Sequence, residues 1–217
     1  MSPDKLSGQA PFAFAHRADL SHLPDAAREY EVHLHGGFAV DARDGFGQIY
    51  YGMPGCGLMR IEADLSRQEI LKLPDELQPL NFHSTKLGQF DGQWRLFMPA
   101  NSAEQVVVLS LEGKVEFVLP RPVFEEYQDR TVPYAPTDTV LVGKQLFIAD
   151  GYGSNYISSA DVTTQQWTGI FGGRTEDPAV EAGSESAVEA RVDRVRKSPS
   201  HVLGVKLAGG PQHYQEG

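Results

Sequence analysis

The feature that most constrains this chain is a repeat of short strand-like runs, which begins near residue 32 and stops near residue 173. Runs rich in Val, Ile, Leu, Phe and Tyr alternate with Gly, Asp, Asn and Pro, a texture typical of short antiparallel strands joined by turns. The second run of each round aligns on Ile49, Leu96 and Leu146, with spacings of 47 and then 50 residues. A period of about 40–50 residues with four strands per unit indicates β-propeller blades.

We therefore expect an all-β fold, a partial β-propeller of about three four-stranded blades. Stacking buries sheet faces that a single four-stranded sheet leaves open, and the alternative is an irregular β-sandwich with coincidental spacing. The predicted parts are an N-terminal arm (1–30), the partial propeller (31–173, with blades over 31–75, 79–121 and 134–173) and a C-terminal tail (174–217).

A partial ring raises the question of what completes it. Propellers typically close with 4–8 blades, so three blades leave two sheet faces and several strand edges without a neighbour. The sequence predicts either self-association of two copies through the open blade edges or an incomplete version of a longer protein, and we favour the second.

The repeat ends abruptly at Arg174. Residues 174–217 contain one aromatic residue, Tyr214, and no strand-like alternation. Three valines share one face of a possible helix over 185–197, with acids early and bases late, an order that suits the helix dipole. We expect a flexible tail around this helix, and a shifted reading frame after residue 173 would also explain the change.

Charge and composition exclude several classes of partner. The 217 residues carry a formal net charge of −10, which argues against a nucleic-acid groove and against binding to an anionic membrane. No run approaches the ~20 apolar residues of a membrane span, and the polar start lacks the pattern of a signal peptide. We therefore expect a cytoplasmic chain, although an altered N-terminus would erase that reasoning. The single cysteine, Cys56, rules out an internal disulfide.

Blade-start residues are the first candidates for a site, because loops at one end of the blades meet near the central channel. His35, His83 and the pair Thr137-Asp138 stand at these starts. Imidazole and carboxylate suit zinc and similar ions, so the two histidines could hold a metal, with Thr137 and Asp138 lining the channel. The alternative, favoured by the spacing alone, is that both histidines hydrogen-bond backbone at a strand start.

The segment from Asp150 to Asn155 is a second candidate. Its structural interpretation is a tight turn between strands, in which Asp150 can accept backbone N–H groups and Gly151 and Gly153 permit positive φ. Its functional interpretation is that Tyr152 points its phenol into the channel as an acid or base. Asp150 and Asn155 would then line the channel beside it.

Two further features favour ordinary structural roles. The acidic run within residues 125–130 could supply paired carboxylates, but such a run is more often a solvated loop. Cys56 lies between two glycines without a histidine partner in the pattern, so a buried or edge cysteine is the better interpretation.

A family resemblance becomes visible in the third round. The stretch Pro136-Thr137-Asp138-x-Val140, followed by Leu146-Phe147-Ile148-Ala149-Asp150-Gly151-Tyr152-Gly153-x-Asn155-x-Ile157, resembles an NHL-type propeller repeat. Within that group it is most similar to peptidyl-α-hydroxyglycine α-amidating lyase. The resemblance implies a six-bladed propeller that holds zinc with three histidines and uses a tyrosine and an arginine to cleave a hydroxyglycine.

The family's site residues transfer only in part. The resemblance makes Tyr152 the catalytic tyrosine, His83 the first zinc histidine and Asp138 a structural or channel-lining residue. Where the arginine is expected, the sequence reads Tyr51-Gly52-Met53-Pro54, and the later blades with the other histidines have no counterpart.

Two functional hypotheses follow. The first is an NHL-type binding or scaffold propeller for a peptide, a small molecule or a protein partner, with no nucleic acid or membrane involved. The second is a zinc-dependent lyase that uses His35, His83 and Tyr152. We favour the first, because the catalytic set is incomplete.

Overall fold

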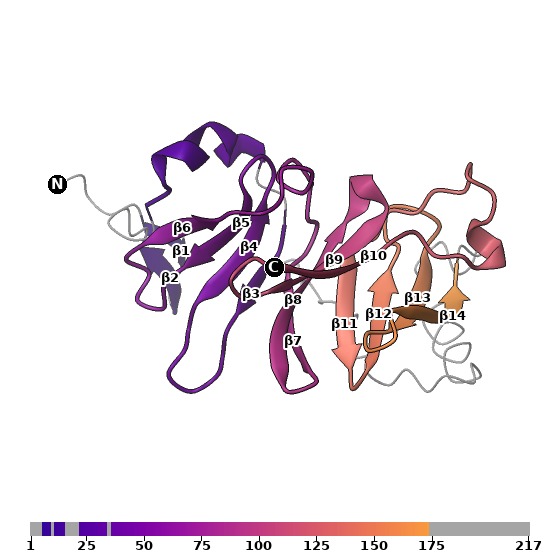
Figure 1. Ribbon diagram of the computed structural model, residues 1–217. Coiled ribbons are helices and arrows are strands. Elements are labelled where there is room, and N and C mark those ends of the chain that lie inside the picture. Colours follow the sequence, from indigo (N-terminus) through magenta and orange to yellow (C-terminus); the bar gives the residue numbers. More distant parts are fainter. Residues whose placement is uncertain (1–5, 10, 16–21, 34–35, 174–217) are drawn as a thin grey trace.

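The computed structural model describes residues 6–9, 11–15, 22–33 and 36–173, and three four-stranded antiparallel sheets form its body (Figure 1). We call them blades 1 to 3. Blade 1 contains β3 (Phe38–Val40), β4 (Ile49–Met53), β5 (Gly57–Ile61) and β6 (Gln68–Leu71). Blade 2 contains β7 (Lys86–Phe90), β8 (Gln93–Ala100), β9 (Gln105–Ser110) and β10 (Val115–Leu119). Blade 3 contains β11 (Asp138–Val142), β12 (Gln145–Ala149), β13 (Tyr156–Asp161) and β14 (Gln166–Gly172).

Each blade is a simple meander, in which every strand pairs with the next one along the chain. The first strands of neighbouring blades lie close together, since β7 contacts both β3 and β11. The three sheets follow one another in chain order across the molecule (Figure 1). This arrangement confirms the predicted all-β fold with three four-stranded propeller blades.

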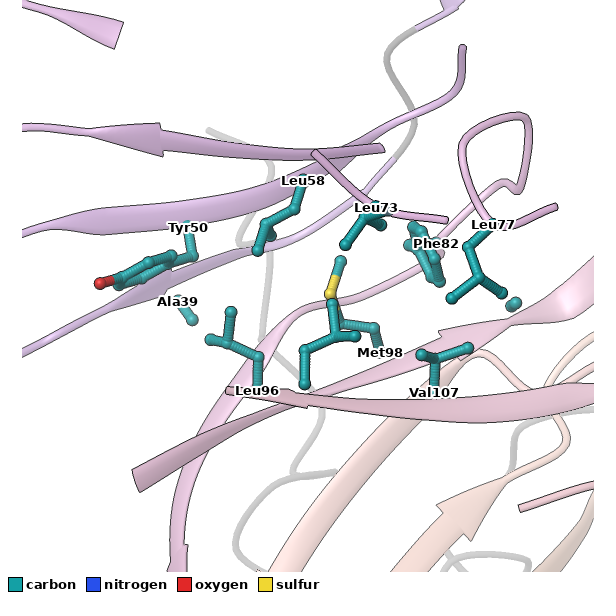
Figure 2. Close-up of a cluster of buried hydrophobic side chains, with 11 residues drawn as sticks. Ala39, Tyr50, Leu58, Leu73, Leu77, Phe82, Leu96, Met98 and Val107 are labelled. Atoms are coloured by element: carbon teal, nitrogen blue, oxygen red, sulfur yellow. The ribbon is translucent and has the colours of Figure 1, made fainter. Parts of the chain in front are cut away.

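Two cores fill the spaces between blades, and both arise from strand alternation. Figure 2 shows the first, in which Tyr50 and Leu58 of blade 1 form one cluster with Leu96, Met98 and Val107 of blade 2. The second lies between blades 2 and 3 and includes Phe97, Val108, Leu146, Ile148 and Ala160. Since most of these side chains are fully buried, the blades form a packed stack rather than separate sheets.

A third apolar cluster covers the face of blade 1 that points away from blade 2. The 3₁₀ helix η1 (Asp25–His33) lies against β4, and its Ala27 is fully buried there. Ala27 joins Tyr51, Met53, Cys56 and Met59 in one cluster. The N-terminal segment thus covers part of one of the two sheet faces that the three-blade count left open, while Phe38 and Val40 on the same face stay 54% and 55% exposed.

Smaller elements complete the described chain. A hairpin of β1 (Leu6–Gln9) and β2 (Phe12–Ala15) lies in the predicted N-terminal arm, where the sequence pattern indicated no strands. Two short 3₁₀ turns, η2 (Asn101–Ala103) and η3 (Glu125–Tyr127), follow β8 and β10. Within the described ranges, no helix is long and apolar enough to cross a membrane. The predicted tail and its helix over 185–197 lie outside the described residues.

Candidate functional site

Strand register defines which blade-start residues are equivalent. Lys86 pairs with Phe97 in blade 2, and Val140 pairs with Phe147 in blade 3. Three residues earlier, the backbone N–H of His83 donates to Pro99 at 2.9 Å and that of Thr137 donates to Ala149 at 2.8 Å. His83 is therefore the counterpart of Thr137, and Asp138 stands one position later. Of the pair Thr137-Asp138 at the start of blade 3, Thr137 therefore holds the position equivalent to His83.

His83 connects the starts of two blades. Its ring atom Nδ1 lies 3.0 Å from the carbonyl oxygen of Thr137. Because a carbonyl oxygen only accepts, Nδ1 carries the proton of this hydrogen bond. The structure thus shows the backbone hydrogen bond that the sequence offered as the alternative to metal binding.

Tyr152 stands directly beside this histidine. The two rings meet edge to face, with centroids 4.8 Å apart and an interplanar angle of 90°. Such T-shaped contacts are a favoured arrangement of aromatic rings. Tyr152 is 62% exposed, so its ring is fixed on one side by His83 and open to solvent on the other. The structure brings together the two residues that the sequence singled out.

Asp150 anchors the turn that carries Tyr152. Its carboxylate is 1% exposed and accepts three hydrogen bonds, from the Tyr127 hydroxyl at 2.7 Å, the Ala135 N–H at 2.7 Å and the Ser154 N–H at 2.6 Å. Burial, together with the hydrogen bond to Asp150, raises the pKa of Tyr127 well above its ordinary value, so the phenol stays protonated and donates. Asp150 therefore lies beneath the surface that we expected it to line.

This turn requires glycines because a side chain would not fit at these positions, and not because of their φ angles. Neither Gly151 nor Gly153 has a positive φ, although glycine would permit one. A Cβ on Gly153 would meet an Asp150 carboxylate oxygen at 2.1 Å, and one on Gly151 would meet the Thr137 hydroxyl at 2.5 Å. The left-handed residue is Asn155, with φ of 61°. Its N–H donates to the Asp150 carbonyl at 3.0 Å, and its exposed side chain stands at the end of the turn.

Asp138 lies near this group and is engaged by a cation. Its Oδ1 is 3.2 Å from Nζ of Lys86, and both side chains are nearly half exposed. The same oxygen accepts the N–H of Thr139 at 2.9 Å. Asp138 thus adds a solvated ion pair beside the blade starts, where exposed pairs contribute little to stability.

The connection between blades 2 and 3 holds residues that sequence reasoning missed. Arg121 is 8% exposed and donates to the backbone carbonyls of Tyr127, Asp129 and Val132, the last at 2.5 Å. Its Nη1 also lies 3.1 Å from a carboxylate oxygen of Glu104. Arg121 thereby shapes the loop that presents Tyr127 to Asp150. The one sequence signal for this role is a tyrosine inside an otherwise acidic run.

Two sequence features that favoured structural roles do have them. Glu125, Glu126 and Asp129 are exposed in a solvated loop, as the acidic run predicted. Cys56 is buried, and burial raises the pKa of its thiol.

The described residues do not assemble a zinc site. With Nδ1 bound to Thr137, Nε2 is the only ring atom of His83 that could ligate a metal. Across residues 6–9, 11–15, 22–33 and 36–173, no group of three or more His, Cys, Asp or Glu side chains could hold a metal ion. His35, the predicted second ligand, lies outside the described residues.

Comparisons with known proteins add little beyond the fold. No protein-family model matches the chain, and no curated protein matches it. Among solved structures, it is similar to apo AztD from Citrobacter koseri, with 11% sequence identity and a TM-score of 0.44. The match covers 78% of this chain and 41% of that one, so the chain spans less than half of that protein. Likeness at this level carries no argument about ligand or activity.

Proposed function

We propose that this chain is a β-propeller binding module of NHL type, whose ligand docks at the blade starts around Tyr152 and His83. The observation that carries this proposal is an exposed tyrosine whose ring packs edge to face on His83. Its turn is fixed by the buried carboxylate of Asp150, and its ring is fixed against His83. A tyrosine that is already ordered offers a large contact area at low entropic cost, as in many binding loops.

The chemistry around this ring suits a peptide segment. Tyr152 offers an apolar ring with a polar tip, and the ion pair of Lys86 and Asp138 lies along the same blade starts. This set favours stacking and neutral hydrogen bonds over the capture of a strongly charged ligand. The resemblance of residues 136–157 to an NHL-type repeat supports a binding role.

A peptide-library selection on the whole chain tests this proposal. Peptides enriched on the unmodified protein are measured by calorimetry against Tyr152→Ala and His83→Ala. We expect Tyr152→Ala to weaken binding at least about tenfold, because central aromatic anchors carry most of the energy of such contacts. Val123→Ala is the matched control, since Val123 is 74% exposed on a separate loop. Enriched peptides that bind Tyr152→Ala as well as the unmodified chain would contradict the proposal.

The zinc-dependent lyase remains the second candidate, favoured by the adjacency of Tyr152 and His83. It predicts stoichiometric zinc binding and turnover of a peptide ending in α-hydroxyglycine, both lost in His83→Ala. Unchanged metal content and activity in His83→Ala would contradict it. Tight zinc binding with turnover would instead overturn a purely binding role.

A further inference from the structure

The connection between blades 2 and 3 reaches the turn that carries Tyr152 and contacts both of its ends. At the first end, the Tyr127 hydroxyl donates to Oδ2 of Asp150 at 2.7 Å, and both residues are buried. At the other end, the hydroxyl of Ser154 donates to the carbonyl oxygen of Pro133 at 2.8 Å. The turn is therefore held by a segment that precedes blade 3 in the sequence.

The Asp150 carboxylate links the position of Tyr127 to that of the turn. Tyr127 and the backbone N–H of Ser154 donate to the same oxygen, Oδ2, at 2.7 and 2.6 Å. The N–H of Ala135 donates to the other oxygen, Oδ1, at 2.7 Å. The backbone of Gly153 lies directly against the carboxylate, since a Cβ there would overlap both oxygens. Because no side chain separates the carboxylate from this backbone, a shift of the carboxylate would move the turn with it.

The position of Tyr127 is set by its own neighbours. The residue is 2% exposed, and its ring meets the rings of Tyr134 and Tyr156 edge to face, with centroids 5.2 and 5.6 Å apart. Arg121 donates to its carbonyl oxygen through Nε and Nη2 at 3.4 and 3.3 Å. Because these contacts restrict both the ring and the backbone, the hydroxyl is held in the direction of Asp150.

We infer that Tyr127 is a positioning residue for the proposed ligand site. Acting through Asp150, its hydroxyl holds the turn in the place where the Tyr152 ring packs edge to face on His83. Removing this donor leaves a buried acceptor unsatisfied, so the carboxylate and the turn above it relax toward other arrangements. The effect on ligand affinity rests on the proposed function, whereas the effect on the turn is measurable without a ligand.

Tyr134 provides a matched control within the same cluster. It is 2% exposed, as Tyr127 is, and the two rings pack against each other. In the described part of the chain, the hydrogen bonds to the Asp150 carboxylate come from other donors than the Tyr134 hydroxyl. Tyr134→Phe therefore removes the same kind of hydroxyl from the same depth and leaves the donors to Asp150 in place.

Nuclear magnetic resonance of the whole chain with labelled histidine tests the effect on the turn. A neighbouring aromatic ring shifts the signals of ring protons, so His83 reports how close the Tyr152 ring lies, and Tyr152→Ala gives its signals without that contact. We expect Tyr127→Phe to move the His83 signals clearly toward the Tyr152→Ala values, and Tyr134→Phe to leave them where they are in the unmodified chain. Amides of residues 151–155 should exchange with deuterium at least about fivefold faster in Tyr127→Phe alone.

Calorimetry with the peptides selected on the unmodified chain measures the effect on the ligand site. Tyr127→Phe should weaken binding at least about fivefold, and Tyr134→Phe by less than about twofold. Circular dichroism checks that each variant is folded. If Tyr127→Phe fails to fold, Ser154→Ala takes its place with the same expectations, because it removes the contact between the turn and Pro133.

The outcomes separate this inference from the proposed function. His83 signals and turn exchange that are the same in Tyr127→Phe and Tyr134→Phe would overturn the inference, and so would a displaced turn that binds peptide with unchanged affinity. If no peptide binds at Tyr152, the proposed function fails, and the His83 signals alone then decide whether Tyr127 positions the turn.

Discussion

At the scale of single residues, the candidate site depends on a carboxylate that solvent does not reach. Asp150 accepts hydrogen bonds from Tyr127, Ala135 and Ser154. In Asp150→Asn, an amide group that donates would face at least one of these donors. We expect the free energy of unfolding to fall by about 2–3 kcal/mol, the usual cost of leaving buried partners unsatisfied. Urea denaturation measures this loss.

The matched control for Asp150 is Asp138, which makes an exposed ion pair with Lys86. Asp138→Asn should change the free energy of unfolding by no more than about 0.5 kcal/mol, since exposed pairs contribute little. Similar losses in both variants would show that burial does not distinguish the two carboxylates.

A second carboxylate, Asp41, makes stability depend on pH. It is 1% exposed, and Arg43 donates to it through Nε at 2.7 Å and Nη2 at 2.5 Å. The hydrogen bonds from Arg43 lower the pKa of Asp41. A lowered folded-state pKa adds stability above the unfolded value of about 3.9, and this stability is lost as pH falls through the folded value.

Asp41→Asn should therefore be less stable than the unmodified chain at neutral pH, by about 2 kcal/mol. This difference should narrow as the pH falls from about 5 toward about 2. Unfolding by urea at a series of pH values measures it. A difference that is constant or that widens in acid would contradict the role assigned to Asp41.

At the scale of elements, local patterns predicted the strands because each strand carries its own alternation. Leu146-Phe147-Ile148-Ala149 is a short apolar run bounded by turn residues, and the structure buries Leu146 and Ile148 more fully than Phe147 between them. The Asp91-Gly92 pair likewise indicates a hairpin turn. Asp91 and Gly92 adopt φ values of 49° and 73°, and such a hairpin needs positive φ at both positions. The repeat also indicated the candidate site, because aligning the three repeats places His83 and Tyr152 at the same end of neighbouring blades.

Contacts between distant segments were not predictable in this way. The sequence did not show why glycines stand beside Tyr152, because their role depends on where the Asp150 carboxylate and the Thr137 hydroxyl lie, and only the folded chain fixes those positions. Arg121 was missed because its acceptors are backbone carbonyls, and every sequence offers carbonyls at every residue. The packing of η1 on blade 1 was also missed, because a short 3₁₀ segment has little apolar pattern that could show which surface it contacts.

One buried arginine, Arg121, holds the long connection from blade 2 to blade 3. Substituting it therefore tests how this connection stays ordered. Arg121→Met keeps much of the side-chain volume but removes the donors to Tyr127, Asp129 and Val132. We expect amides in residues 122–136 to exchange with deuterium at least about tenfold faster, because local opening then costs less. Arg130→Gln is the control, since Arg130 is 77% exposed in its pair with Glu104. Equal exchange in the two variants would remove Arg121 from this role.

At the scale of the whole molecule, stability should follow the number of neighbours that each blade has. In stacked repeat proteins, stability approximates a sum of repeat and nearest-neighbour terms. Blade 2 packs on both of its faces, and blade 1 packs on blade 2 and on η1. Blade 3 shares a described core with blade 2 alone. The stack should therefore open first at blade 3.

Native-state hydrogen exchange, at a protein concentration low enough to keep the chain monomeric, tests this order. Amides of β12 and β13 should open with a free energy at least about 1 kcal/mol below that of β8 and β9, as expected when one cooperative unit is less supported than another. The equivalent pair of phenylalanines sharpens the test. Phe97→Ala should cost about 3–5 kcal/mol as a core truncation, whereas Phe147→Ala, on the face of blade 3 away from blade 2 and partly exposed, should cost less than half as much. Uniform protection across the three blades, or equal losses from the two substitutions, would mean that blade 3 is as fully packed in the monomer as blade 2.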